Sequence, residues 1–228
     1  MNNAGSSDPF VRDGSDSRVS LFDDVEIDGI GLAFEQNAVS EGHLFVAGVD
    51  EVGRGCLAGP VVAAACILDI ARPFPAGLDD SKKLTEKKRD IITAELKQTC
   101  VAYAIGQVEA DEIDRINILE ATKRAMLLAI AGLVPAADYL LIDALHLKQS
   151  DLPQKAIIKG DSISASIAAA SILAKTYRDD LMKAYDIEFP QYGFAGHKGY
   201  GAVTHFAALR IHGPCHLHRR SFRGVLQD

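Results

Sequence analysis

The sequence has few cysteines, and none of them form a pattern typical of zinc binding. The 228-residue chain holds four cysteines, with no CxxC pair, at Cys56, Cys66, Cys100 and Cys215. Such spacing argues against a zinc finger and against a disulfide framework. It is typical of reduced thiols that pack as small apolar side chains. We therefore expect a cytoplasmic protein.

Long hydrophobic runs are also absent. VVAAACIL (61–68) is among the longest apolar stretches, and it is far short of the roughly 20 residues that a membrane-spanning helix needs. The first residues, MNNAGSSDPFVRDGSDS, lack the basic start and apolar stretch of a secretory signal. Because 48% of the residues are hydrophobic, the chain can still bury a sizeable core. The expectation is a soluble, intracellular protein with no membrane partner.

The chain lacks the net positive charge that is common among nucleic-acid-binding proteins. Its formal net charge is −7, but residues 1–43 hold nine acids and two arginines and so carry the whole deficit. The remaining 185 residues have 22 acids and 22 bases, with basic clusters at SKKLTEKKR (81–89) and HLHRRSFRG (216–224). Clustered cations matter more than the total charge for binding a polyanion. A nucleic-acid partner therefore remains possible.

Composition divides the chain into an extension and one folded domain. Residues 1–40 are rich in Ser, Asp, Gly and Asn and predict a mostly disordered acidic extension, whereas residues 41–228 have the pattern of a mixed α/β domain. The first two strands are separated by a short glycine-rich turn, so we expect them to pair antiparallel. Strands followed by alternating strands and helices predict a mixed sheet flanked by helices. Strands are expected at 44–50, 58–68, 101–109, 138–143 and 155–161, and helices at 86–98, 117–133, 162–185 and 201–213.

Carboxylates end three of the strand-like segments: Asp50 with Glu51, Asp143, and Asp161. Ionised carboxylates are costly beside an apolar sheet, and a divalent metal such as Mg²⁺ would compensate for them. The alternatives are structural, since Asp161 suits a helix cap and Asp143 a solvated strand end. In a regular strand Glu51 would face away from Asp50, so a shared site requires the strand to end or distort there.

Three further segments fit ligand binding as well as simpler roles. In GRG (53–55) the glycines let the backbone approach a ligand, or they form a hairpin turn with positive φ. The residues of DDSKKL (79–84) suit phosphate oxygens, or they form a solvated surface. In YGFAGHKGYGAVTH (192–205), aromatic side chains among glycines suit stacking on sugars or bases, or they pack beneath a loop.

Together these segments resemble type 2 ribonuclease H, the ribonuclease HII family, in order and spacing over about residues 44–224. The resemblance implies a ribonuclease H-like fold with a small C-terminal helical part. It also implies an endonuclease, active as a monomer, that needs Mg²⁺ or Mn²⁺. Its substrates would be RNA–DNA hybrids and single ribonucleotides embedded in duplex DNA, cut on the 5′ side to leave 3′-hydroxyl and 5′-phosphate ends. The matching segments are GVDEVGRGCLAGPVVAAACIL (48–68), DDSKKL (79–84), LLIDAL (140–145), IIKGDSISASIAAASILAKTYRD (157–179), YGFAGHKGYG (192–201) and HRRSF (218–222).

The resemblance also implies roles for individual residues. Four carboxylates would bind two metal ions: Asp50, Glu51, Asp143 and Asp161. The 2′-hydroxyl and the backbone at the RNA–DNA junction would be contacted by Gly53, Arg54 and Gly55, and Tyr200 would stack on the deoxyribose that follows the ribonucleotide. Phosphates would be held by Ser81, Lys82, Lys83 and Lys198.

Three positions depart from the family pattern. Cys56 stands where proline is usual, Ala144 where glycine is common, and Gly196 where lysine is common. The first two affect loop geometry and the third a phosphate contact, but none is a carboxylate. Two other readings remain: a non-catalytic nucleic-acid-binding module, or another two-metal phosphodiesterase on the same fold.

Overall fold

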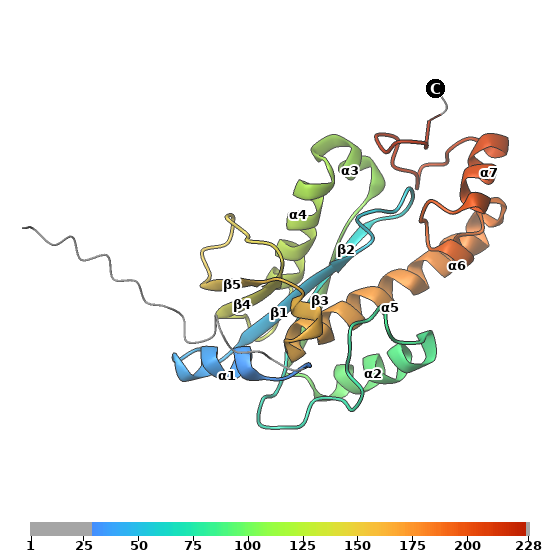
Figure 1. Cartoon of the computed structure of the whole chain (residues 1–228). Coiled ribbons are helices and arrows are strands. Elements are labelled where there is room, and N and C mark those ends of the chain that lie inside the picture. The colour runs from blue at the N-terminus through green and yellow to red at the C-terminus, as the bar shows by residue number, and fades with distance from the viewer. Residues whose placement is uncertain (1–28, 227–228) are drawn as a thin grey trace, which may run out of the picture.

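Five strands form one mixed sheet in the order β3-β2-β1-β4-β5 (Figure 1). The computed structural model describes residues 29–226. Strand β1 pairs antiparallel with β2, and β2 with β3, whereas β4 lies parallel to both β1 and β5. The predicted mixed sheet and its antiparallel first pair are confirmed. The strands are β1 (Val46–Val52), β2 (Val61–Ile67), β3 (Ala102–Val108), β4 (Tyr139–Asp143) and β5 (Gln154–Ile157).

Helices cover both faces of the sheet, which explains why β2 is apolar at every position. Odd-numbered residues of β2, such as Ala63, pack with helix α4 (Ile118–Ala131), and even-numbered ones, such as Ala64, pack with helix α5 (Ala165–Glu188). Successive side chains of a strand point to opposite faces, so a strand that is buried on both sides shows no polar alternation. Within residues 29–226 no helix is long and apolar enough to cross a membrane.

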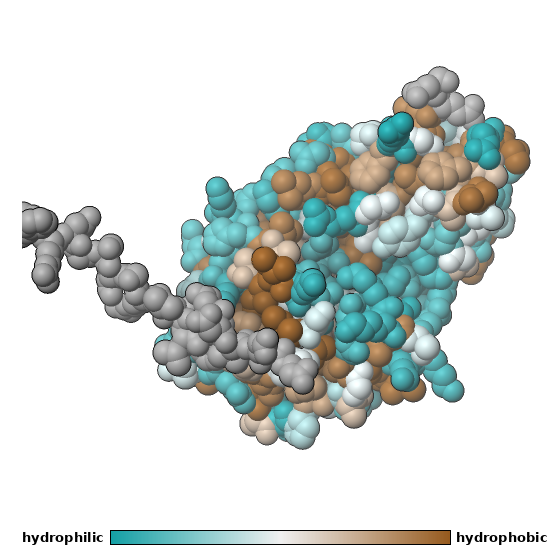
Figure 2. All heavy atoms as spheres, viewed as in Figure 1, coloured by the Kyte–Doolittle hydropathy of each residue, from teal (hydrophilic) through white to brown (hydrophobic). Residues whose placement is uncertain are grey.

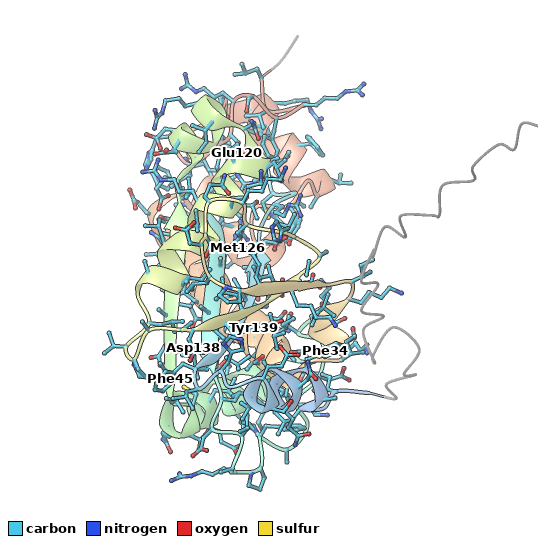
Figure 3. The ribbon with its side chains drawn as sticks, turned by 90° about the vertical axis from the view of Figure 1, so that its left-hand side faces the viewer. Phe34, Phe45, Glu120, Met126, Asp138 and Tyr139 are labelled. Atoms are coloured by element: carbon cyan, nitrogen blue, oxygen red, sulfur yellow. The ribbon has the colours of Figure 1, made fainter. Side chains whose placement is uncertain are left out.

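Local signals explain most of the remaining elements. Helix α2 (Glu86–Thr99) begins where Thr85 accepts a hydrogen bond from the Lys88 N–H, an ordinary N-cap. The start of β1 is fixed beside β4 because the Asp138 carboxylate accepts hydrogen bonds from the N–H groups of Leu44 and Phe45, at 2.8 and 2.9 Å (Figure 3). The other helices are α3 (Ala110–Ile116), α6 (Phe194–His197) and α7 (Val203–His212), with 3-10 turns η1 (Gly160–Ser162) and η2 (Pro190–Tyr192).

The structure differs from the sequence-based expectation in two places that matter for the site. Asp161 does not end a strand: β5 stops at Ile157, and Asp161 lies in the turn η1 after Lys159, whose φ is 56°. The second difference lies in residues 29–40, which belong to the packed structure and include helix α1 (Ala33–Ser40). The expectation of disorder up to residue 40 is therefore wrong for this part. Residues 1–28, where the rest of that expectation falls, lie outside the described residues.

The C-terminal segment forms a small helical unit of its own. Its core contains Phe194, Ala208 and Leu217, and it packs on Leu57 in the loop between β1 and β2. Figure 1 shows this red segment beside the β1–β2 loop. The expected small C-terminal helical part is therefore present, and it lies against the glycine-rich loop.

We predict that Gly48→Ala destabilises the fold, because helix α5 lies directly on β1 there. A Cβ atom at Gly48 would lie 2.1 Å from the carbonyl carbon of Ser166. Overpacking of this kind costs about 1–3 kcal/mol, which urea unfolding would detect. Gly196→Ala is the matched control, because a Cβ at Gly196 meets nothing within 4 Å. Equal unfolding midpoints for the two variants would contradict this close contact.

Candidate active site

Two of the predicted carboxylates lie side by side at the ends of parallel strands. The last paired residues of β1 and β4 are Val49 and Ile142, so Asp50 and Asp143 follow them in register. Parallel strands end at the same edge of a sheet, where ligands of such sheets gather. The two strands therefore bring together carboxylates that are far apart in the sequence.

Glu51 and the glycine-rich loop share this edge. The residues there line one shallow opening of about 210 Å³, and Figure 2 shows hydrophilic side chains gathered across the middle of the face viewed in Figure 1. The Glu51 side chain reaches the opening although it follows Asp50 directly. The strand continues only to Val52, and the loop turns at Gly53, whose φ is 89°. The lining residues are Asp50, Glu51, Val52, Gly53, Arg54, Gly55, Lys82, Asp143 and Tyr200.

Asp161 joins this group from the turn η1. The N–H of its neighbour Gly160 donates a 2.7 Å hydrogen bond to Oδ1 of Asp143. Nζ of Lys82 lies 3.2 Å from Oδ2 of Asp161. Lys82 and the Gly160 peptide thus link Asp161 to the carboxylates of the two strands.

The carboxylates at this edge resist ionisation. Burial, and then the charge of Glu51, raise the pKa of Asp50 well above its usual value. Burial also raises the pKa of Glu51, against the influence of Arg54, and the pKa of Asp143, against a hydrogen bond from Gly160. Keeping all of them charged at neutral pH requires nearby positive charge.

The donor set fits hard divalent cations. Its members are carboxylate oxygens, which Mg²⁺ and Mn²⁺ prefer, and the buried Oε2 of Glu51 has no hydrogen-bond partner in the described part of the chain. As arranged within residues 29–226, no three His, Cys, Asp or Glu side chains already form a metal-binding group. Glu51 and Asp161 are instead paired with Arg54 and Lys82. Cation binding would replace these ion pairs.

Two buried arginines donate hydrogen bonds to backbone carbonyls in and around the glycine-rich loop. The Arg178 guanidinium donates to the carbonyls of Ala58, Pro60 and Lys198, at 2.9–3.0 Å. A Cβ at Gly53 would lie 2.2 Å from Nε of Arg178, so only glycine fits there.

The second arginine, Arg219, donates to the carbonyls of Gly53, Arg54 and Gly59, at 2.7–3.0 Å. Neither Arg178 nor Arg219 makes an ion pair with a carboxylate in the part of the chain that the structure describes. Burial lowers the pKa of Arg219 to about 10, so it stays charged at neutral pH. Two buried cations therefore fix the shape of the loop through its carbonyl groups. From the sequence, Arg219 was expected only as part of the basic cluster 216–224, and no role was expected for Arg178.

The expected phosphate-binding residues occupy different environments. Ser81 is 3% exposed, and its Oγ lies 2.9 Å from Oγ of Ser171 in α5, so its hydroxyl faces the protein. Lys83 is exposed and pairs with Asp79 at 3.1 Å. The ammonium group of Lys198 donates to the Ala195 carbonyl.

Tyr200 displays its ring beside the loop while its backbone is held by a buried histidine pair. Tyr200 is 42% exposed. Nδ1 of His205 donates to the Tyr200 carbonyl at 2.8 Å, and Nε2 of His205 lies 3.0 Å from Nε2 of His218. A carbonyl can only accept, so neutral His205 carries its proton on Nδ1 and accepts a hydrogen bond from His218. Protonation of His205 would place a hydrogen on its Nε2 and remove the acceptor that His218 uses.

Ala144 occupies a backbone position that favours glycine. Its φ is 50°, in the left-handed region that costs a residue with a Cβ about 1–2 kcal/mol. Its N–H donates to the Ile157 carbonyl at 3.0 Å. The departure from the family pattern thus lies at a strained position next to Asp143.

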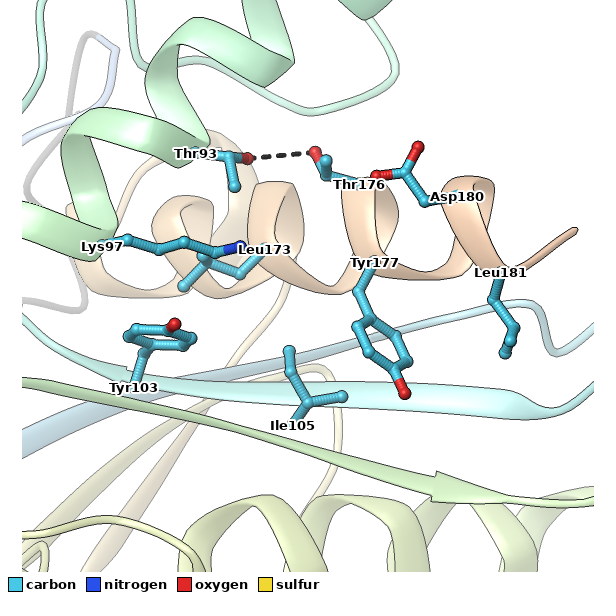
Figure 4. Close-up of a pocket in the computed structure, with 9 residues that line it drawn as sticks. All are labelled: Thr93, Lys97, Tyr103, Ile105, Leu173, Thr176, Tyr177, Asp180 and Leu181. Carbon is cyan, nitrogen blue, oxygen red and sulfur yellow. Dashed lines mark hydrogen bonds between the residues drawn. The ribbon is translucent and has the colours of Figure 1, made fainter. Parts of the chain in front are cut away.

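A larger hollow, of about 440 Å³, lies between α2, α5 and β3 (Figure 4). Leu173, Ile105 and Tyr177 line it, and Asp180 is its single carboxylate. A metal-dependent site needs several converging carboxylates. The smaller opening at the strand ends is therefore the better candidate.

The fold resembles solved structures of ribonucleases H. The ribonuclease H2 of Pyrococcus horikoshii OT3 is 25% identical, with a TM-score of 0.66 over 80% of this chain and 95% of that one. The Mn²⁺ complex of Bst-RNase HIII is 25% identical, with a TM-score of 0.63 over 82% and 70% of the two chains. The fold and the strand-end carboxylates therefore define a ribonuclease H-type endonuclease.

Sequence comparisons narrow this class further. The ribonuclease HII family matches residues 47–225. The ribonuclease HII of Chlamydia caviae is 58% identical over 85% of this chain and 91% of its own length. That of Syntrophotalea carbinolica is 51% identical over 85% and 92%. The chain belongs to the ribonuclease HII family, which supports ribonuclease H activity on RNA–DNA hybrids and a dependence on divalent metal.

We predict that Asp50→Asn stabilises the metal-free protein. The pKa of Asp50 is raised in the folded state, so its stabilising effect is present below the unfolded pKa and is lost as pH rises. At neutral pH the ionised carboxylate destabilises the fold, and asparagine removes that cost. Urea unfolding in EDTA at pH 7.5 should give a higher midpoint for Asp50→Asn than for wild type. Asp90→Asn, at an exposed site in α2, should match wild type, and a lower midpoint for Asp50→Asn would refute the account.

We also predict that acid destabilises the protein through the histidine pair. Burial lowers the pKa of His205 and brings that of His218 from 6.5 to about 4. A depressed histidine pKa contributes stability above the unfolded value that is lost as pH falls toward the folded value. The urea midpoint of wild type should therefore fall between pH 6.5 and 4, and it should fall less in His218→Gln. His146→Gln, at an exposed site, should follow wild type; a His218→Gln profile equal to wild type would count against the account.

Proposed function

We propose that the protein cuts the RNA strand of RNA–DNA hybrids and also cuts on the 5′ side of single ribonucleotides embedded in duplex DNA. The products carry 3′-hydroxyl and 5′-phosphate ends. One observation supports this proposal above others: strand-end carboxylates, the GRG loop and an exposed tyrosine line the same opening. The carboxylates would serve hydrolysis, and the loop and the tyrosine beside them would recognise the sugar.

The carboxylates are assigned to metal binding. Asp50, Glu51, Asp143 and Asp161 would hold two divalent ions, Mg²⁺ or Mn²⁺. When bound, such ions activate the attacking water and stabilise the leaving 3′-oxygen. The chain's own task is to hold these oxygens on strands β1 and β4 and on the turn η1, and no serine or histidine nucleophile is required. Lys82 and Arg54, released from their present ion pairs, would face the phosphate.

The GRG loop is assigned to recognition of the ribose 2′-hydroxyl. Its carbonyls at Gly53 and Arg54 accept hydrogen bonds from Arg219. The N–H groups of Arg54 and Gly55 have no acceptor in the described part of the chain. A 2′-hydroxyl both donates and accepts hydrogen bonds. A site built to bind this hydroxyl discriminates strongly against the deoxy analogue, because the polar groups of the site would then be left unpaired. Glycines keep side chains away from this contact.

The flanking residues are assigned to holding the duplex. Tyr200 would stack on the deoxyribose that follows the ribonucleotide, and Lys83 and Lys198 would contact phosphates. Ser81 is better placed to support the site through Ser171 than to touch a phosphate, because its hydroxyl is buried. We further propose that the enzyme acts as a monomer in the cytoplasm, in keeping with its four free cysteines.

Mapping the cut in a duplex that contains one ribonucleotide tests the proposed function. With Mg²⁺, wild type should cut on the 5′ side of the ribonucleotide, and EDTA should abolish cleavage. Asp50→Asn should lower the rate by about 1,000-fold or more, because charge stabilisation at the reacting phosphate is lost, while Asp90→Asn should cut normally. Cleavage in EDTA, or full activity of Asp50→Asn, would sink the metal assignment. A cut at another position would refute the ribonucleotide assignment.

Tyr200→Ala tests the stacking role. Loss of an aromatic stacking platform costs about 1–3 kcal/mol, so we expect cleavage at a single ribonucleotide to weaken about tenfold or more. Tyr177→Ala is the matched control, because Tyr177 is 41% exposed and lines the separate hollow beside β3. Equal single-ribonucleotide cleavage by wild type and Tyr200→Ala would exclude stacking by this ring.

A further inference from the structure

Helix α1 carries a buried carboxylate that the proposed reaction does not use. Glu35 is 1% exposed. Its Oε1 accepts hydrogen bonds from the Ser164 hydroxyl at 2.7 Å, the Ser166 N–H at 2.9 Å and the Ser166 hydroxyl at 2.6 Å. Its Oε2 has no partner among the described residues. A buried carboxylate with one oxygen unsatisfied costs stability, so its presence requires an explanation.

The residues that Glu35 binds begin helix α5 and directly follow the turn η1. Ser164 is the N-cap of α5 and accepts a hydrogen bond from the Ile167 N–H. An anion at a helix N-terminus is stabilised by the helix dipole, so α5 compensates part of the Glu35 charge. Asp161 lies three residues before this cap. Glu35 therefore holds the chain immediately after a proposed metal ligand.

The strand-like residues before α1 bind the same segment. The Gly31 N–H donates to the Ile163 carbonyl at 3.2 Å, and the Ala165 N–H donates to the Gly31 carbonyl at 2.9 Å. Residues 31–35 thus make two main-chain hydrogen bonds and three Glu35 hydrogen bonds to residues 163–166.

The segment that Glu35 holds is rigidly connected to the other carboxylates. Ser166 lies against Gly48 of β1, two residues before Asp50. On the other side of η1, the Gly160 N–H binds Asp143. A shift of residues 163–166 would therefore change the position of Asp161 relative to both strand-end carboxylates.

We propose that Glu35 is a positioning residue that sets the place of Asp161 and thereby the affinity of the site for divalent metal. This inference rests on the proposed assignment of Asp161 as a metal ligand. Glu35 acts through Ser164, Ser166 and the turn η1, not by touching metal or substrate. Removing the Glu35 hydrogen bonds should lower the affinity of the site for metal, although all four carboxylates are still present.

Helix α1 also packs on the sheet through apolar side chains, and a substitution among these side chains provides the control. Ala38 packs with Val46 and Leu141 in a small apolar cluster, and partly buried Phe34, Val39 and Tyr139 pack against it; Figure 3 labels Phe34 and Tyr139 on this side of the molecule. Val39→Ala should weaken the docking of α1 without altering the Glu35 hydrogen bonds. It separates loss of helix packing from loss of the positioning contact.

The test measures Mn²⁺ binding by isothermal titration calorimetry on the full-length protein without substrate, well below the unfolding temperature. Outer-shell partners of metal ligands typically contribute 10–100-fold in affinity. We expect Glu35→Ala to bind Mn²⁺ about 10-fold or more weakly, and to need correspondingly more Mg²⁺ for half-maximal cleavage. Glu35→Gln keeps one acceptor oxygen but loses the charge, so it should lie between Glu35→Ala and wild type. Val39→Ala should be less stable to urea, with wild-type Mn²⁺ affinity.

Two results would overturn the proposal: wild-type Mn²⁺ affinity in a folded Glu35→Ala, or weaker Mn²⁺ binding by Val39→Ala in proportion to its lost stability. If Glu35→Ala does not fold, Glu35→Gln decides by the same criterion. Failure of the assignment of Asp161 as a metal ligand is separable, because Asp161→Asn would then bind Mn²⁺ as tightly as wild type.

Discussion

Two buried guanidinium groups determine the shape of the glycine-rich loop, and the rest of the site depends on them. Arg178 and Arg219 receive no compensating carboxylate within the described residues, and backbone carbonyls of the loop and of Lys198 satisfy their N–H groups instead. Burying an unpaired cation is costly, and seven hydrogen bonds to backbone carbonyls offset that cost in this loop conformation. Glycine is required at position 53 because the Arg178 guanidinium lies where a Cβ atom would stand. The loop is therefore rigid, although its composition alone would indicate flexibility.

Negative charge is concentrated at the ends of strands β1 and β4, which line the same opening as the loop. Burial raises the pKa of Asp50, Glu51 and Asp143, and the neighbouring carboxylates Glu51 and Asp143 raise that of Asp50 further. Lys82 and Arg54 neutralise part of the charge through their ion pairs with Asp161 and Glu51. The buried carboxylates thus lower the stability of the fold. The apolar layers between the sheet and helices α4 and α5 offset this loss. This is the usual relation between an active site and the fold that carries it.

The sheet and the long helices were predictable from the sequence, because apolar runs and the Thr85 cap depend on neighbouring residues. The assignment of the four carboxylates to metal binding stays a prediction. Three features were not predictable. Asp161 was expected at a strand end, since nothing in the residue type of Lys159 indicates its left-handed conformation. Ser81 resembled a phosphate ligand because its burial depends on contact with α5. Glu35 was missed because it lies in an acidic stretch, and its partner Ser166 is 131 residues away.

The hydrogen bond from Arg219 to the Gly53 carbonyl joins residues 166 positions apart, and this separation matters while the protein is being translated. A ribosome releases the chain from its N-terminus, so the loop and most of the carboxylates emerge long before the arginine that shapes the loop. Until then the Gly53 and Arg54 carbonyls lack that donor, and the C-terminal helical unit is incomplete. The glycine-rich loop therefore takes its final shape only after residue 219 has been made, long after the strands beside it.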